Sequence, residues 1–302
     1  MRDESYLRVG TRILHLSRLE KIYYPETGFK KKDVLLYYRQ IAPVLLPHLK
    51  SRPLTLKRYP EGVQGDYFYE KRCPSYRPPW FNTVEHTGIK FCDVGDLASL
   101  VWIVNLGSLE LHTSLSRAPR LEQPSTMVFD LDPGAPAGIH ECAQVALKIR
   151  SLLDDLNIEC FPKTSGSKGL QLYVPLKATA GYLQTKSFAR AIAEHLEREI
   201  PELVVSRMIK KIRAGRVFID WSQNDVHKTT VCVYSLRATP LPSASTPLEW
   251  LEVEQAAKGK SSLFFSPADV LKRVSEQGDL FRSTLTLQQD LPTSARRWLK
   301  AA

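Results

Sequence analysis

The chain has 302 residues, of which 43% are hydrophobic, and its formal net charge is +10. This length and apolar content allow one large or two small domains with a buried core. The sequence contains no run of 18 apolar residues, so we predict no membrane-spanning helix. Met1-Arg2-Asp3-Glu4 lacks the apolar core of a signal peptide, and the five cysteines form no C-x-x-C pair. We therefore expect a cytoplasmic protein with reduced thiols, without a zinc site or disulfide framework.

The positive charge is concentrated in two segments of the chain. Residues 1–58 contain 13 Lys and Arg against 5 Asp and Glu. A second basic cluster contains no acidic residue and consists of Arg207, Lys210, Lys211, Arg213 and Arg216. Basic surfaces attract polyanions, of which nucleic acid is the commonest, although a basic protein can also be merely soluble. Two separate clusters favour a nucleic-acid partner.

The first sixty residues predict a strand at 11–16, a turn at 24–28 and a helix at 33–46 with apolar residues at helical spacing. Lys30-Lys31-Lys32 precedes that helix. Free amides at a helix start, together with lysines, can hold a phosphate. A solvated basic turn is the alternative interpretation.

Residues 53–92 predict β-structure and loops, followed by an apolar helix at 96–106. Tyr67-Phe68-Tyr69 lies between two pairs of basic residues, a pattern that suits base stacking and equally suits an ordinary strand. Alternation over residues 108–112 places Glu110 and His112 on one strand face. A histidine there could bind phosphate, although an isolated histidine is more often structural.

Residues 125–221 predict the order β-α-β-β-α-β. The expected strands are 125–131, 158–162, 170–174 and 203–205, and the expected helices are 139–156 and 186–200. This order is the split βαβ, or ferredoxin-like, arrangement, whose sheet carries helices on one face and leaves the other open to a ligand.

Three aspartates are the candidate metal ligands. Asp130 and Asp132 end an apolar strand before Pro133-Gly134, and alternate strand residues point to the same face. Asp220 lies inside the apolar segment 216–221, where a charge is costly unless it is paired or bound to metal. Three such carboxylates suit two divalent ions, which stabilise the attacking and leaving oxygens of a phosphoryl displacement.

Two further segments suit phosphate binding. The loop 164–169 contains hydroxyl residues, two glycines and Lys168, and can cradle phosphates with backbone N–H groups or simply close a hairpin. A predicted strand at 229–237 ends in Arg237, which could grip a triphosphate. The remaining tail predicts a segment that wraps the domain and a short helix at 267–275.

Taken in order, these motifs resemble one family. They are Phe129 to Gly134, Thr164 to Gly169, Val217 to Trp221 and Val233 to Arg237, together with Leu19 to Pro25 and Pro247 to Trp250. The family is the polymerase domain of bacterial DNA ligase D, within the archaeo-eukaryotic primase superfamily. The resemblance implies a primase-polymerase fold of the α/β (α+β) class. Its split βαβ core sheet would occupy residues 121–302, and an N-terminal β-rich basic module residues 1–120, in one compact polymerase unit.

The resemblance also implies the activity and its site. The activity would be template-dependent nucleotidyl transfer, preferring ribonucleotides over deoxyribonucleotides, at DNA breaks and gaps in non-homologous end joining. Two metal ions, Mn²⁺ or Mg²⁺, would be held by Asp130, Asp132 and Asp220. The phosphates of the incoming nucleotide would be held by His112, Ser165, Lys168 and Arg237. Relatives often carry a second arginine directly after the residue matched by Arg237, whereas this chain has Ala238-Thr239.

The resemblance assigns DNA contacts to five residues. Lys21 and Lys31, with Arg18 beside them, match positions that grip the 5′-phosphate of the downstream strand. Phe68 and Tyr69 match aromatics that stack on the template. The implied partners are DNA ends and gaps with a 5′-phosphate, the ligase and nuclease domains of a full-length ligase D, and Ku. The implied location is the bacterial nucleoid.

Two other functions remain open from the residues. A metal-dependent nuclease or phosphatase could use the same carboxylates, although the Asp-x-Asp-x-Thr phosphatase signature is not met because Gly134 stands where Thr would. A DNA-end-binding module without catalysis is the second alternative. Carboxylates and water suit magnesium and manganese alike.

Overall fold

The structure is a computed structural model that describes residues 4–292. The chain divides into two compact units, which we describe one at a time. Unit 1 comprises residues 1–114, 229–245 and 265–279, and unit 2 comprises residues 115–228, 246–264 and 280–302. The first boundary between the units, after residue 114, lies close to the one expected at residue 120. Two later segments, 229–245 and 265–279, belong to unit 1 as well. Within residues 4–292, no helix is long and apolar enough to cross a membrane.

Unit 1 combines an antiparallel sheet, whose strands are not in sequence order, with three helices. Its strands are β1 (Glu4–Val9), β2 (Arg12–Ser17), β3 (Ile22–Tyr24), β4 (Phe29–Lys30), β5 (Leu54–Arg58), β6 (Phe68–Glu70), β7 (Thr83–His86), β8 (Ile89–Cys92), β9 (Ser108–Thr113), β17 (Thr230–Val231), β18 (Leu236–Arg237) and β19 (Ser243–Ala244). Its helices are α1 (Lys31–Leu49), α2 (Leu97–Asn105) and α6 (Pro267–Gln277). The main sheet has the order β17-β9-β5-β8-β7, with β6 also paired to β5.

Helix α1 is longer than the predicted 33–46 and carries much of the core of unit 1. Asp33 accepts a hydrogen bond from the Lys30 backbone N–H, which fixes the first turn. Tyr37 and Tyr38 are fully buried, and their hydroxyls donate to the carbonyls of Tyr234 and Leu109. These bonds satisfy the two buried hydroxyls and join α1 to strand β9 and to the segment before β18.

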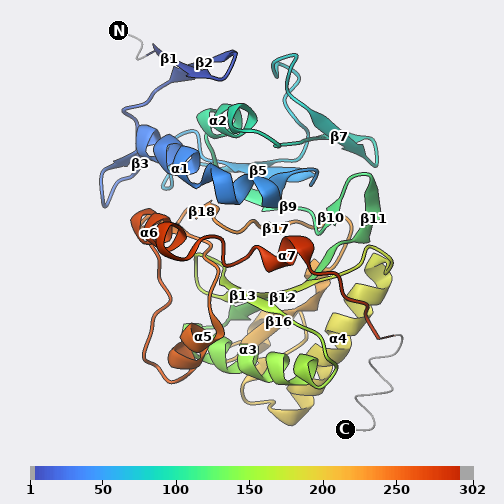
Figure 1. The fold of residues 1–302 in the computed structure, drawn as a ribbon. Helices are drawn as coiled ribbons and strands as arrows, with labels where there is room; N and C mark the ends of the chain where they lie inside the picture. Colours follow the sequence, from blue (N-terminus) through green and yellow to red (C-terminus); the bar gives the residue numbers. More distant parts are fainter. Residues whose placement is uncertain (1–3, 293–302) are drawn as a thin grey trace. The chain divides into compact units, whose positions relative to one another are not determined.

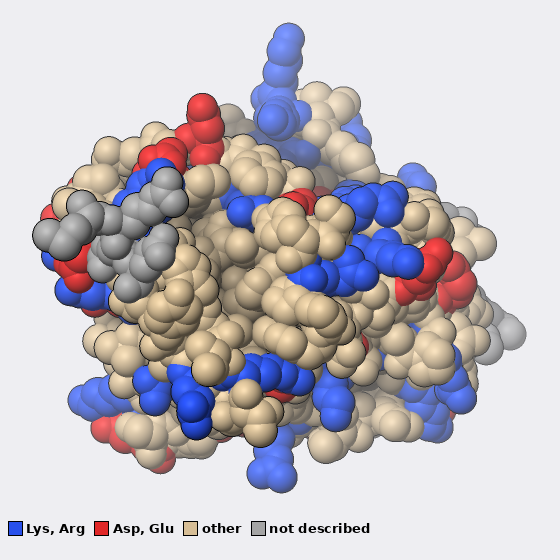
Figure 2. Space-filling view, turned by 90° about the horizontal axis from the view of Figure 1, so that it is seen from above, with Lys and Arg blue, Asp and Glu red and all other residues tan. Residues whose placement is uncertain are grey.

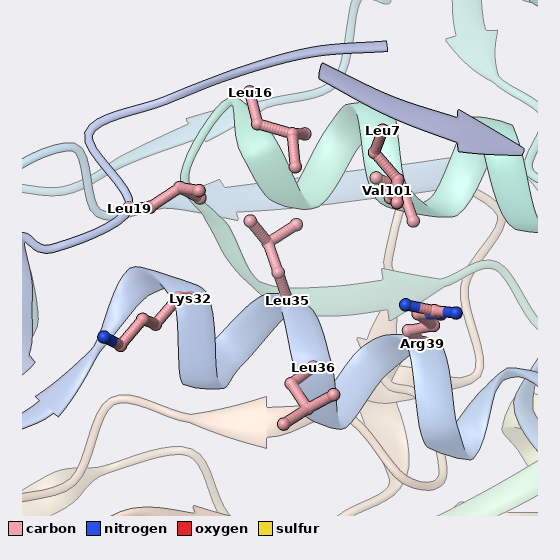
Figure 3. A pocket seen from close by; sticks show the side chains of 8 residues that line it. All are labelled: Leu7, Leu16, Leu19, Lys32, Leu35, Leu36, Arg39 and Val101. Atoms are coloured by element: carbon pink, nitrogen blue, oxygen red, sulfur yellow. The ribbon is translucent and has the colours of Figure 1, made fainter. Parts of the chain in front are cut away.

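Side chains from the β1–β2 hairpin, from α1 and from α2 point toward one another (Figure 3). A groove of about 170 Å³ remains between them. It is lined by two cationic and six aliphatic side chains, namely Lys32, Arg39, Leu7, Leu16, Leu19, Leu35, Leu36 and Val101.

Unit 2 contains the sheet that carries the aspartates. Its strands are β10 (Ser116–Arg117), β11 (Arg120–Pro124), β12 (Thr126–Pro133), β13 (Phe161–Thr164), β14 (Leu170–Pro175), β15 (Val204–Val205) and β16 (Val217–Asp220). Its helices are α3 (Ile139–Asp154), α4 (Tyr182–Glu199), α5 (Trp250–Ala257) and α7 (Ser283–Thr286). The main sheet has the order β13-β14-β12-β16-β15, and α3 and α4 lie on the same side of it (Figure 1).

This topology confirms the split βαβ arrangement with one difference. In the predicted order, the strand at 203–205 would lie next to the strand that carries Asp130. Instead β16 occupies that place, antiparallel to β12, and β15 lies outside it, parallel to β16. The strand that carries Asp220 therefore pairs directly with the strand that carries Asp130 and Asp132.

In the C-terminal third, one predicted strand was wrong and one helix was missed. The expected single strand at 229–237 is interrupted by a turn, because Tyr234 has a φ of +65°. The Tyr234 N–H donates to the Ser245 carbonyl and its hydroxyl to Asp279, so the turn is anchored at both ends. Helix α5 was not predicted, whereas the helix expected at 267–275 is confirmed as α6.

Candidate functional site

A row of four polar side chains crosses the main sheet of unit 2. Asp130 on β12 is paired in register with Asp220 on β16 and with Gln171 on β14, which is in turn paired with Lys163 on β13. Residues directly opposite in antiparallel strands point to the same face of the sheet. Neighbours in the same strands, including Phe129, Leu131 and Ile219, are fully buried. The row therefore lies on the face away from the apolar side chains that pack under the helices.

Hydrogen bonds fix all four members of this row. The fully buried Lys163 ammonium donates to Gln171 Oε1 at 2.6 Å, and Gln171 Nε2 donates to Asp130 Oδ1 at 3.0 Å. Asp220 Oδ1 accepts from the backbone N–H of Ser222 at 3.0 Å and from its hydroxyl at 2.5 Å. The Asp130 and Asp220 side chains are therefore held from opposite sides of the row.

The three aspartates form a concentration of negative charge. Asp132 follows Asp130 by two residues on the same face and is exposed, while Asp130 and Asp220 are half-buried. Burial, the charge of Asp132 and the charge of Asp220 raise the pKa of Asp130 to about 7, against the hydrogen bond from Gln171. Such crowding indicates a place for a cation. Within residues 4–292, no three His, Cys, Asp or Glu side chains are positioned to hold one ion together.

The loop with Ser165 and Lys168 lies beside the aspartates. It joins β13 to β14, and a Cβ atom at Gly169 would lie 2.0 Å from the Leu131 carbonyl oxygen, so glycine is required for the loop to approach β12 this closely. The Ser165 hydroxyl accepts from the Gly169 N–H at 3.1 Å, and the Lys168 side chain is exposed. The loop is thus shaped by its own hydrogen bonds, approaches β12 at Leu131, and carries an exposed lysine.

Glu110 is the centre of a second cluster, which lies in unit 1. It is 2% exposed, and its carboxylate accepts from His112 Nε2 at 2.9 Å and from the Tyr59 hydroxyl at 3.2 Å. Arg237 Nε lies 3.5 Å and Lys57 Nζ 3.6 Å from its oxygens. Burial acts to raise the pKa of Glu110, but His112, Arg237 and Lys57 together hold it at about 2. One carboxylate therefore faces two permanent cations and a histidine, an excess of positive charge that suits an anion.

The same cluster shifts the pKa of His112. Burial lowers the pKa of His112 below its ordinary value, although Glu110 acts to raise it. A neutral His112 whose Nε2–H donates to Glu110 has a fixed ring orientation. Of the nucleotide-binding residues predicted from sequence, His112 and Arg237 are therefore brought together in unit 1, and Ser165 and Lys168 in unit 2.

The predicted stacking aromatics lie on β6, next to the Glu110 cluster. Phe68 and Tyr69 are 44% and 57% exposed, enough to present ring surface to a base. Lys57 Nζ lies 5.5 Å from the Tyr69 ring centre, and the Tyr69 ring is 6.1 Å from the His112 ring. The Phe68 ring is 5.1 Å from the guanidinium of Arg58.

Of the three residues predicted to hold a 5′-phosphate, Arg18 and Lys21 lie at the surface and Lys31 is buried. Arg18 and Lys21 both pair with the exposed carboxylate of Glu61. Lys31 is 4% exposed, and its ammonium donates to the Ser17 carbonyl at 2.6 Å and to Asn105 Oδ1 at 2.9 Å. Burial, with the charges of Arg18 and Lys21, lowers its pKa to about 8. Lys31 thus anchors the start of α1, while the exposed Arg18 and the half-buried Lys21 share the carboxylate of Glu61.

The second basic cluster is partly structural. Arg213 and Arg216 are half-buried and donate to backbone carbonyls of Met208 and Pro201. Lys210 and Lys211 remain exposed. Seen from above, Lys and Arg side chains recur across the surface, where Asp and Glu occupy smaller groups (Figure 2).

Comparison with known proteins decides the family. The model of the LigD primase-polymerase domain matches residues 30–281. The chain belongs to this family. It is 39% identical over 283 residues to the multifunctional non-homologous end joining protein LigD of Mycolicibacterium smegmatis, covering 92% of this chain and 36% of that protein. It is 32% identical to the bifunctional LigD of Bacillus subtilis, covering 93% of this chain and 46% of that protein.

A solved structure supports the same assignment. The polymerase domain of Mycobacterium tuberculosis ligase D, determined in complex with DNA, superposes with a TM-score of 0.84 at 36% identity. The match covers 91% of this chain and 99% of that domain. The chain thus has the LigD polymerase-domain fold, and it spans less than half the length of the two LigD proteins described above.

Sequence reasoning missed several polar residues of this LigD-type domain. Lys163 and Gln171 belong to segments that read as ordinary strands, and only the register of β13, β14 and β12 reveals that they lead to Asp130. Glu110 was placed on the face of His112, which is correct, but its role as the common partner of three cationic or basic side chains was not visible. The local sequence gives little signal for either residue, because Glu110 stands in an alternating polar and apolar strand and Lys163 is followed by Thr164.

Proposed function

We propose that this LigD-type domain is a template-dependent polymerase that adds nucleotides to primer 3′-OH ends at DNA breaks and gaps during non-homologous end joining, with a preference for ribonucleotides. The observation that carries the proposal is the register of β12 and β16, which sets Asp130 opposite Asp220 with Asp132 on the same face. A polymerase needs such a carboxylate set to bring two divalent ions to the reacting phosphate.

The donor set fits Mn²⁺ or Mg²⁺, because both prefer carboxylate oxygens. Asp130, Asp132 and Asp220 would hold the two ions. When bound, these ions would lower the pKa of the primer 3′-OH and neutralise the triphosphate. Gln171 and Ser222 orient the aspartates by the hydrogen bonds described above, so part of the site is preorganised before a metal binds.

The other residues would bind substrate. The phosphates of a ribonucleoside or deoxyribonucleoside triphosphate would be held by His112, Arg237, Ser165 and Lys168. By positioning the nucleotide, these residues would make the main contribution of the protein to catalysis. Arg18 and Lys21, supported by Lys31, would hold the 5′-phosphate across a gap, and Phe68 and Tyr69 would stack on the template. The proposed partners are the ligase and nuclease domains of a full-length LigD, and Ku.

One assay tests this function against its rivals. The substrate is a primed DNA gap with a 5′-phosphate, supplied with Mn²⁺ and one ribonucleoside triphosphate complementary to the template. Growth of the primer by the templated nucleotide supports the polymerase. Shortening of the primer would point to a nuclease, and an unchanged primer with tight gap binding would point to an end-binding module. The same gel with a deoxyribonucleotide measures the sugar preference.

We predict that Lys163→Met lowers the rate of primer extension about 10-fold. It should also raise the Mn²⁺ concentration needed for half-maximal activity, because Lys163 would orient a metal ligand. Methionine keeps most of the buried volume but removes the ammonium that fixes Gln171. The matched variant is Gln171→Leu. Because the two side chains act in series on Asp130, the double variant should be no worse than Gln171→Leu alone. Additive losses would show that Lys163 does not act through Gln171.

We predict that Glu61→Gln strengthens binding to gaps with a 5′-phosphate by about threefold, the scale of a surface ion pair. Glu61 pairs with both Arg18 and Lys21, so a phosphate has to displace it. Affinity for the same gap ending in a 5′-hydroxyl should change less. Glu26→Gln makes the same change in net charge at an exposed site and serves as the control. Equal gains for both DNA ends would disprove competition between Glu61 and the phosphate.

A further inference from the structure

Two buried cysteines of unit 1 are in direct contact. Cys73 lies in the irregular segment 71–82 after β6, and Cys92 is the last residue of β8. The Cys92 thiol donates to Cys73 Sγ at 2.7 Å, and the two residues are 4% and 1% exposed. The Cys73 N–H donates to the Lys90 carbonyl at 2.7 Å, which holds the segment against β8. The polymerase mechanism uses neither residue.

The surroundings of the two thiols differ, so that one can react first with an oxidant and the other can react afterwards with the oxidised product. The hydrogen bond from Cys92 and the charge of Arg77 favour the thiolate of Cys73 and lower its pKa. The same hydrogen bond, with burial, raises the pKa of Cys92. A thiolate is the nucleophile toward oxidants, and a neighbouring thiol can then resolve the oxidised product.

For a small oxidant to reach the pair, the segment 71–82 has to open locally. Lys71, Arg72, Ser75 and Tyr76 around Cys73 are exposed. Segments with exposed backbone open locally at a much lower free-energy cost than the whole unit. The burial of Cys73 therefore slows oxidation by a peroxide without preventing it.

We propose that Cys73 and Cys92 are a site of reversible disulfide formation, with a peroxide as the oxidant. The Cys73 thiol first releases its proton to solvent, and the thiolate attacks one oxygen of hydrogen peroxide. The O–O bond breaks, Cys73 sulfenic acid forms, and the departing hydroxide takes up a proton from solvent to give water. Cys92 sulfur then attacks Cys73 sulfur, and the hydroxyl group leaves with the Cys92 proton as a second water. The two thiols lose two electrons, which reduce the peroxide to water.

The disulfide has a structural consequence next to the predicted template-stacking strand. It closes a covalent ring between residues 19 positions apart, so that segment 71–82 is tied to β8. A ring of this size restricts the unfolded chain and raises stability. Oxidation is therefore expected to raise the Tm by a few degrees and to reduce cleavage of segment 71–82 by proteases. The inference does not depend on the proposed polymerase activity.

The test uses the full chain and mass spectrometry. The reduced protein is treated with hydrogen peroxide, unfolded, alkylated with iodoacetamide and digested with trypsin. We expect the mass of the protein to fall by two hydrogen atoms before alkylation. Tryptic peptide 73–90 should be linked to peptide 91–117. Dithiothreitol should restore five alkylated cysteines.

Two variants complete the test. Cys73→Ser should abolish the link, whereas Cys142→Ser should retain it, because Cys142 is buried in unit 2 with its pKa raised by burial. Wild-type protein that keeps five alkylatable thiols after peroxide treatment, or that links other cysteines, would overturn the proposal. Over-oxidation of Cys73 without a link would do the same. The wild-type measurement decides the matter even if a variant fails to fold.

Discussion

Asp130→Asn is expected to lower the rate of primer extension by a factor on the order of 10³. The substitution keeps the oxygen that accepts from Gln171 but removes the charge that would hold divalent ions between β12 and β16. Asp220→Asn should have an effect of the same size, because Asp220 faces Asp130 in register. Rates are measured by single-turnover extension of a primed gap with saturating Mn²⁺ and nucleotide.

The loss should occur without unfolding. Asp132 and Asp220 repel the charge of Asp130, so its removal is expected to leave the Tm unchanged or higher. Binding to the gap, measured by fluorescence anisotropy, should also be retained. The control is Asp225→Asn, which removes a carboxylate of unit 2 that pairs with Lys186. Extension by Asp130→Asn at more than a tenth of the wild-type rate would contradict the assignment of the metal ligands.

The sequence predicted the features that depend on local patterns. The i, i+2 spacing of Asp130 and Asp132 placed them on one strand face, and the helical spacing of apolar residues located α1, α2, α3 and α4 to within a few residues. The family resemblance predicted the fold, which the comparisons confirm. The roles of individual residues in metal, nucleotide and DNA binding stay predictions.

The features that were missed depend on pairing between distant strands. Nothing near Asp220 in the sequence shows that β16, rather than β15, lies next to β12. The left-handed conformation of Tyr234 divides a stretch with strand composition, and a non-glycine residue seldom adopts it. Similarly, Lys31 looked like the middle of an exposed basic run, but its ammonium is committed to Ser17 and Asn105.

Glu110→Gln is expected to lower both stability and catalysis. The wild-type carboxylate is buried with His112, Arg237 and Lys57 around it, and its loss leaves cations in the interior without their counter-ion. Breaking a buried pair in this way costs about 3 kcal/mol in the free energy of unfolding. Urea denaturation measures that loss, and Glu85→Gln on the exposed part of β7 is the matched control.

The pH dependence of stability tests the same cluster. In the unfolded chain Glu110 titrates near its ordinary pKa of 4.5, whereas in the folded protein its pKa is about 2. As the pH falls through this window the unfolded chain takes up the proton first, so the stabilisation present above pH 4.5 is lost. Glu110→Gln should therefore unfold with a smaller dependence on pH between 4.5 and 2 than the wild type. A pH profile parallel to that of the wild type would show that Glu110 is not held ionised.

The effect of Glu110→Gln on catalysis shows whether Glu110 helps to position the nucleotide or only stabilises the fold. Glu110 orients His112 and lies beside Arg237, the two residues of unit 1 proposed to hold the triphosphate. At a temperature where the variant is fully folded, the KM for the nucleotide should rise about 10-fold, since the phosphate ligands lose their fixed orientation. Binding to a gap without nucleotide should be retained. If stability falls but the KM is unchanged, Glu110 supports the fold of unit 1 and has no part in placing the nucleotide.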